Sequence, residues 1–243
     1  MNLNAGYLAA TRHPWPCLLF VLPLLVAYET GVLMLGGTTP ETIRNGADHW
    51  LRCGLSTIGL KFFWVPPLLL ILVFLIWVGR SWKDRPSDLT GVLSGMVLES
   101  VAFALGLWVL SRALAPLLQH VGIELNVAPA DPSAEAALRQ VVTYLGAGIY
   151  EEAVFRLVLF SLLLVIFQWV EIAPGSAEVL AAIGSSLLFS VAHHVGPYGQ
   201  PYSNYLFLFR VVAGLYFAAL FRLRGFGIAV GTHACYNVMV SIN

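Results

Sequence analysis

The sequence predicts an all-α polytopic membrane protein, a bundle of seven or eight transmembrane helices that forms a single integral membrane domain over residues 1–243. Of the 243 residues, 58% are hydrophobic and only 11% are charged, and the mean hydropathy is +0.80. A soluble domain carries roughly 25% charged residues. Several apolar runs also approach the roughly 20 residues with which a helix crosses the hydrocarbon core of a bilayer. Composition and run length therefore indicate that the chain lies in a lipid bilayer.

Seven apolar segments are predicted as spans. The first exceeds the 7–15 residues of a signal peptide's apolar region, so we expect it to be retained. The fourth has 33 residues, about 50 Å of straight helix, and we expect a break or kink near 146–148, where Gly146 and Gly148 lie. The intervening residues 38–61 and 119–136 are interpreted as polar connections. The approximate spans are 17–37, 62–78, 89–118, 138–170, 178–194, 205–221 and 226–242.

Charge and cysteine content narrow the class of partner. The formal net charge is zero and no cluster of lysine and arginine stands out, so we expect no nucleic-acid partner. Cys17, Cys53 and Cys235 are odd in number and have no regular spacing, which predicts neither a disulfide framework nor a zinc finger.

The fourth predicted span contains two adjacent carboxylates and an arginine in the stretch AGIYEEAVFRLVLF, residues 147–160. Charged side chains within a span usually face the protein interior and mark a functional site. Glu152 and Arg156 are four residues apart with the acid first, the favourable order for an ion pair on one helix face. Glu151 is turned about 100° away. We therefore interpret Glu152 and Arg156 as a structural pair and Glu151 as the carboxylate available for chemistry.

Three polar residues on later spans complete a candidate site. His193 ends the fifth span, and His233 and Asn237 lie four residues apart on one face of the seventh. In a seven-span arrangement, Glu151, His193 and Asn237 fall in one leaflet, with His233 about a turn deeper. A carboxylate and an imidazole can hold and deprotonate a water, while a second imidazole and an amide donate to an oxyanion. This set suffices for amide hydrolysis.

Alternative interpretations of these residues stay open at this point. Glu151, His193 and His233 have the donor types of a catalytic zinc site, although an HExxH helix is absent and asparagine is a poor zinc ligand. Taken singly, each residue could also be a structural core or interfacial side chain. Phe189, His194 and Glu99 are possible supporting residues around the site.

At these residues the sequence resembles the CAAX prenyl protease and bacteriocin-processing family, also called the Abi family, a group of intramembrane proteases. Its three motifs correspond here to Glu151-Glu152 with Arg156, to Phe189 with His193, and to His233 with Asn237, and the similar region spans 144–242. The resemblance implies a CAAX-endopeptidase helix bundle. It further implies that Glu151 and His193 activate water and that His233 and Asn237 stabilise the oxyanion, without a cofactor; zinc is the alternative.

The sequence thus predicts an intramembrane endopeptidase that cleaves near the end of a membrane-anchored or lipidated protein or peptide. We expect a multi-pass protein of the bacterial plasma (inner) membrane. The alternative is a non-catalytic immunity, partner-binding or transport protein of the same fold. Transport predicts polar groups spread along a path across the bilayer, whereas here they concentrate in three motifs, which favours hydrolysis.

Overall fold

The computed structural model describes residues 3–120, 134–197 and 199–242, and within these ranges the chain is helical with no strand. The predicted all-α fold is confirmed. Four of the described helices are long and apolar enough to cross a membrane, namely those at 14–36, 89–120, 174–192 and 204–224, and the apolar helix at 65–80 is shorter.

The helices in chain order are α1 (Leu3–Arg12), α2 (Pro14–Gly36), α3 (Gly46–Thr57), α4 (Val65–Arg80), α5 (Leu89–His120), α6 (Ala134–Gly146), two π-helical segments η3 (Ala147–Glu151) and η4 (Ala153–Phe160), α7 (Ser161–Trp169), α8 (Pro174–Ala192), α9 (Asn204–Arg224) and α10 (Phe226–Ile242). Short 3₁₀ turns lie at Pro40–Thr42 and Trp82–Asp84. Proline opens α2 and α8, where its missing N–H donor is not needed.

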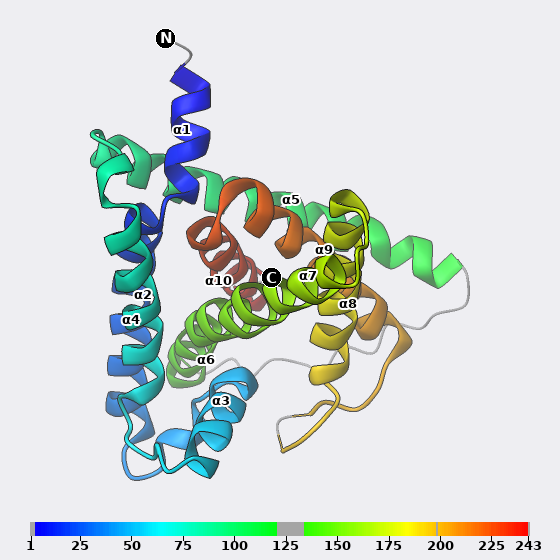
Figure 1. Ribbon diagram of the computed structural model, residues 1–243. Helices are drawn as coiled ribbons and strands as arrows, with labels where there is room; N and C mark the ends of the chain where they lie inside the picture. Colours follow the sequence, from blue (N-terminus) through cyan, green and yellow to red (C-terminus); the bar gives the residue numbers. More distant parts are fainter. Residues whose placement is uncertain (1–2, 121–133, 198, 243) are drawn as a thin grey trace.

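Helix α10 is the centre of the arrangement. It packs against α5, α9, α2 and α6 and against the π-helical segment η3, and Figure 1 shows it enclosed by these elements. Helices α2 and α4 lie side by side at one end of the molecule, and α8 and α9 pair at the other. The two ends are thus joined through α10 and the long α6–α7 run.

The outer helix faces carry the side chains expected next to lipid. On α4, large apolar residues are exposed while Phe74 on the inner side is 1% exposed. Apolar atoms cover more than half of most protein surfaces, but a helix exposed mainly through leucine, isoleucine and valine matches a hydrocarbon environment. The exposed leucine, isoleucine and valine residues of α4 are Leu68, Leu69, Leu72, Val73, Leu75 and Ile76.

All seven predicted apolar segments coincide with helices whose ends lie a few residues from the expected ones. The expected break near 146–148 is instead a change of helix type, from α at Gly146 to π at Ala147, within a continuous helical run. Whether each helix crosses the bilayer stays a prediction.

Two predicted connections contain helices. Residues 38–61, interpreted as a polar connection, include the amphipathic helix α3, and the segment before the first span forms α1. At the connection predicted for 119–136, α5 extends to His120 and α6 begins at Ala134. Residues 121–133 of this connection lie outside the described residues. Residues 38–61 connect α2 to α4, and the helix inside this connection was not predicted, because a short polar helix lacks the apolar length on which membrane spans are recognised.

Candidate active site

Glu151 lies at the junction of the two π-helical segments. Its carboxylate is 9% exposed and is approached from two other elements. The Nε2 atom of His193, at the end of α8, and the Nε2 atom of His233, on α10, each lie 3.7 Å from Glu151 Oε2. Glu151 Oε2 has no hydrogen-bond partner among the described residues. Two imidazole nitrogens therefore converge on one carboxylate oxygen.

The far nitrogen of each imidazole is held by an oxygen acceptor. His193 Nδ1 lies 2.8 Å from the carbonyl oxygen of Phe189, and His233 Nδ1 lies 2.8 Å from Glu152 Oε1. An oxygen acceptor at Nδ1 assigns the ring proton to that atom. In the neutral rings, the Nε2 lone pairs therefore face Glu151. His233 is also stacked on Phe217, with ring centroids 4.4 Å apart.

Glu152 supports the site from behind. It is fully buried, as is Arg156, and Arg156 Nε lies 3.4 Å from Glu152 Oε2. Arg156 Nη2 also donates to the carbonyl oxygen of Gly214 at 3.2 Å, and its guanidinium lies over the ring of Phe189. The predicted Glu152–Arg156 pair is thus present in the structure. Glu152 additionally binds His233, a contact that sequence spacing alone did not predict.

The close approach of η3 and α10 brings Glu151 and His233 together. A Cβ atom built on Gly148 would lie 2.9 Å from the carbonyl oxygen of Val230 and 3.0 Å from the backbone nitrogen of Ala234. A larger side chain would therefore push α10 away. π-Helical turns are rare and frequently occur at functional sites, and here they include Glu151 and flank Glu152 on both sides.

The remaining predicted residues differ in their distance from Glu151 and in their partners. Asn237 lies one turn beyond His233 on α10 and is half-buried. Phe189 packs against His193, with ring centroids 4.7 Å apart. His194 binds the carbonyl oxygen of Gln200 through Nδ1 at 3.0 Å. Glu99 was predicted as a possible supporting residue, but Arg224 binds it with two nitrogens at 2.5–2.9 Å, so its charge is used there.

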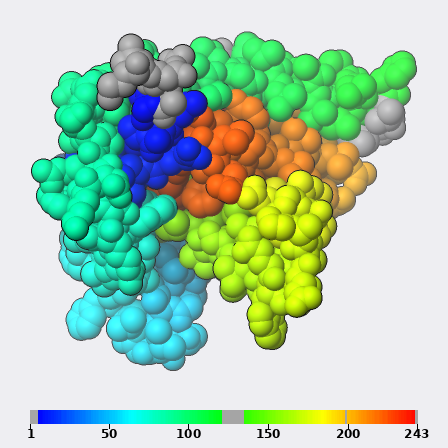
Figure 2. All heavy atoms as spheres, turned by 45° about the horizontal axis from the view of Figure 1, so that its top comes forward, coloured from blue at the N-terminus to red at the C-terminus, as the bar shows by residue number. Residues whose placement is uncertain are grey.

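A small pocket with a volume of about 60 Å³ opens beside Glu151 and His193. This volume is large enough to hold water molecules next to the two side chains. One wall is helix α3 and the other is the end of α8, and Figure 2 shows the hollow between the light-blue and yellow surfaces of these helices. The residues that line it are Gly46, Ala47, Trp50, Glu151, Phe155, Ala192, His193 and Val195.

Helix α3 contributes residues that the sequence interpretation did not place at the site. Asn45 Nδ2 donates to Glu151 Oε1 at 3.3 Å, and Trp50 lines the pocket. A signal was present in the sequence: Asn45 followed by Asp48 is a helix-start pattern, and Arg44, Asp48 and Arg52 are spaced four apart. These spacings predict α3 but not its partner in the fold.

The distances among the donor atoms of Glu151, His193 and His233 bear on the zinc alternative. Two imidazoles and a carboxylate are suitable zinc donors, and ligands of a tetrahedral zinc lie about 3.3 Å apart for bonds of about 2.0 Å. The nitrogen-to-oxygen separations of 3.7 Å are longer. Among the described residues, no group of three histidine, cysteine, aspartate or glutamate side chains could hold a metal ion as arranged. The donor types fit zinc, but their arrangement does not.

A comparison with known protein families finds a match in the part of the chain that contains the site. Residues 133–239 match the sequence model of a family described as type II CAAX prenyl endopeptidase Rce1-like. Neither the search among curated proteins nor the search among solved structures found a match. The matched segment contains both carboxylates, both histidines and Asn237. Residues 133–239 are therefore similar to an Rce1-like domain, which confirms the resemblance of this part of the chain to the CAAX prenyl protease and bacteriocin-processing family.

Proposed function

We propose that this protein is an intramembrane endopeptidase in which Glu151 and His193 activate the attacking water. The Rce1-like domain supports peptidase activity at the level of the family. The observation that carries the finer proposal is the convergence of two imidazole nitrogens on one unpaired oxygen of Glu151, each at 3.7 Å. A water that donates one hydrogen to Glu151 Oε2 and one to His193 Nε2 is polarised from two sides.

The tautomers assign different roles to the two histidines. His193 donates its Nδ1 hydrogen to the backbone carbonyl oxygen of Phe189, so its Nε2 lone pair can accept a hydrogen bond from water. The Nδ1 atom of His233 contacts Glu152, and this contact orients the ring so that Nε2 points toward Glu151. Protonated His233 donates from Nε2 to the developing oxyanion, and the Asn237 amide is the second donor. The proton taken by Glu151 and His193 then passes to the departing amine.

The surroundings of the site indicate a peptide with apolar side chains. Trp50, Phe155 and Val195 form the walls of the pocket next to Glu151. A membrane-anchored or lipidated protein segment, cleaved near its end, would present such side chains from the bilayer. A bacterial inner-membrane location fits this proposal. The rival proposal is a non-catalytic immunity, partner-binding or transport protein, which needs no group positioned to deprotonate water.

Cleavage by the purified protein in proteoliposomes tests the proposal. The substrates are quenched-fluorescence peptides, with and without a lipid anchor. Glu151→Gln and His193→Ala are expected to lower kcat by roughly a thousandfold, within the range of lost acid–base catalysis, while thermal unfolding is unchanged. Glu178→Gln is the matched control, since Glu178 pairs with Arg222 at the exposed end of α8. Full activity of Glu151→Gln would refute the assigned role, and parent protein that cleaves no peptide of the panel would favour the non-catalytic alternative.

A further inference from the structure

Asn45 connects helix α3 to the carboxylate of Glu151. It precedes the first residue of α3 and is 5% exposed. Its Oδ1 accepts from the backbone N–H of Asp48 at 3.0 Å, which caps the helix. Its Nδ2 donates to Glu151 Oε1 at 3.3 Å. Both ends of the amide are therefore engaged, and the cap fixes which end faces Glu151.

This hydrogen bond selects the reactive oxygen of Glu151. With Oε1 bound to Asn45, the carboxylate is turned so that Oε2 faces His193 and His233. Oε2 has no hydrogen-bond donor among the described residues and keeps its lone pairs for a water. If the side chain rotated freely, neither oxygen would remain aligned with both imidazoles. A displacement of about 1 Å at a reacting group can cost a hundredfold in rate.

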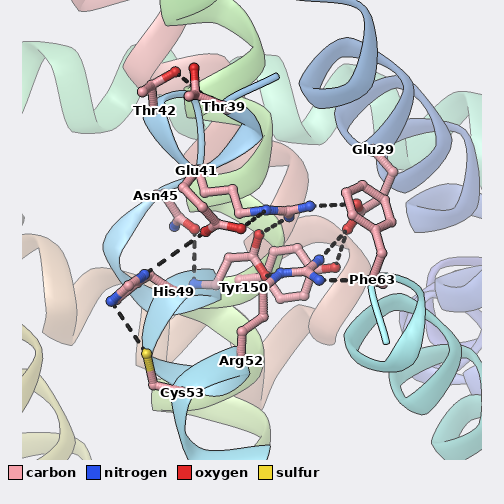
Figure 3. A network of polar contacts seen from close by, with 12 residues as sticks. Glu29, Thr39, Glu41, Thr42, Asn45, His49, Arg52, Cys53, Phe63 and Tyr150 are labelled. Atoms are coloured by element: carbon pink, nitrogen blue, oxygen red, sulfur yellow. Dashed lines mark hydrogen bonds and ion pairs between the residues drawn. The ribbon is translucent and has the colours of Figure 1, made fainter. Parts of the chain in front are cut away.

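A buried charge network holds Asn45 in place. Asp48, at 0% exposure, binds Arg44, and it accepts from Arg52 Nε at 2.8 Å and from the Tyr28 hydroxyl at 2.8 Å. Figure 3 shows the network around Asn45. Tyr28 and Glu29 belong to α2, so their contacts with Asp48, Arg44 and Arg52 hold α3 against α2.

The same network reaches the chain beside Glu151 by a second route. Glu29 on α2 accepts from the Tyr150 hydroxyl at 2.6 Å and from Arg52 at 3.3 Å (Figure 3). Tyr150 directly precedes Glu151 on η3. Asn45 and Glu151 are therefore each adjacent in sequence to a member of one network. Their separation is fixed by the network's contacts as well as by their own hydrogen bond.

We infer that Asn45 is a positioning residue for hydrolysis, which orients the carboxylate of Glu151 so that Oε2 faces His193 and His233. The inference rests on the proposed role of Glu151. It extends the site beyond residues 133–239, the part of the chain that matches the family. Helix α3 is thus a functional part of the active site as well as a wall of the pocket.

Two substitutions separate positioning from helix capping. Asn45→Ser keeps an oxygen that can cap α3, but its side chain is too short to reach Glu151. Loss of a hydrogen bond to a charged group is expected to lower kcat/KM by roughly ten- to a hundredfold, with thermal unfolding unchanged. Asn45→Asp also keeps the cap, but it places a second carboxylate beside Glu151. Because like charges oppose ionisation, the acidic limb of the kcat/KM profile is expected to move up by about one pH unit or more.

Controls keep this result distinct from a failure of the proposed function. Asn204→Ser and Asn204→Asp make the same chemical changes at an exposed position at the start of α9, and they should leave the rate and the pH profile unchanged. Parent rate and parent pH profile in both folded Asn45 variants would overturn the inference even though the parent protein cleaves. If the parent enzyme cleaves nothing while Glu151 is intact, the proposed function itself fails.

Discussion

The adjacent residues Glu151 and Glu152 have different roles because their carboxylates face different partners. Glu151 faces two imidazole nitrogens and the amide of Asn45, whereas Glu152 is enclosed by Arg156 and the Nδ1 atom of His233. His233 lies between them and contacts both carboxylates through opposite ring nitrogens. The residue interpreted as structural therefore also sets the tautomer and orientation of a proposed catalytic histidine.

Glu152→Gln tests this double role at the residue scale. The substitution removes a buried charge that Arg156 and His233 both contact, and loss of one partner of a buried ion pair costs about 3 kcal/mol or more. We expect a lower free energy of unfolding and, in the remaining folded protein, a lower kcat because His233 loses the carboxylate that orients its ring. Thermal unfolding and single-turnover cleavage measure the two effects.

The control for Glu152→Gln is the exposed pair Arg222–Glu178, which is opened by Arg222→Gln. Exposed ion pairs contribute about 0–1 kcal/mol, so this variant should unfold nearly as the parent protein does. A folded Glu152→Gln protein with parent stability would show that Arg156 does not depend on Glu152.

At the scale of elements, the site forms where three helical segments and one helix end meet. Glu151 ends the π-helical segment η3 and Glu152 lies between η3 and η4, α8 ends at the residue before His193, and α10 contributes His233. Small residues let these segments approach closely in a membrane protein. Gly148 against α10 is one such contact, and Gly214 against Ser186 is another, where a Cβ atom would lie 2.8 Å from the serine.

Gly148→Ala tests the contact between η3 and α10. The added methyl group would meet backbone atoms of Val230 and Ala234 within 3.0 Å, so the two elements must separate. Overpacking of this kind typically costs about 1–3 kcal/mol, and the wider Glu151–His233 separation should lower kcat at least tenfold. Thermal unfolding and kinetic assays measure the change.

Gly175→Ala is the comparison, because an added Cβ atom on Gly175, in the first turn of α8, would have no atom within 4 Å. Alanine is the better helix former, and we expect parent activity with equal or slightly higher stability. A Gly148→Ala protein that behaves like Gly175→Ala would contradict the close packing of η3 on α10.

At the scale of the whole molecule, polar groups are concentrated inside a bundle whose outer surface is apolar. The buried charged side chains are grouped: Glu29, Arg44 and Asp48 in one network, Glu151, Glu152 and Arg156 at the site, and Arg224 with Glu99 at a third position. Paired charges inside a bundle avoid the cost of an isolated charge in hydrocarbon. The first two networks meet at the Tyr150–Glu151 step, which joins the α2–α3 end of the molecule to the proposed catalytic centre.

Metal removal tests which chemistry this centre supplies. Because the imidazole nitrogens lie too far from Glu151 to share a tetrahedral zinc with it, we expect cleavage to persist after dialysis against chelators. Elemental analysis of the active protein should show no stoichiometric metal. Loss of cleavage on chelation, restored by zinc but not by magnesium, would replace the glutamate mechanism with the zinc alternative.

Much of this structure was predictable from local patterns. Hydropathy predicted the all-helical membrane fold, and helical spacing predicted the Glu152–Arg156 pair. The partner of Glu99, the contact of Glu152 with His233 and the position of Asn45 were not predictable, because each joins residues far apart in the chain. The helix α3 was missed for a different reason: a short polar helix gives no span-length apolar signal, although its Asn45–Asp48 cap was visible.

The sequence by itself determined the membrane class, the helices and the set of polar residues that a site could use, since apolar run length and spacing of three or four residues are local properties. Only the tertiary structure decided which oxygen of Glu151 faces the histidines, which imidazole nitrogens carry the protons, and that α3 lies over the site. These properties depend on the distances between packed helices, and no local pattern in one helix encodes its separation from another.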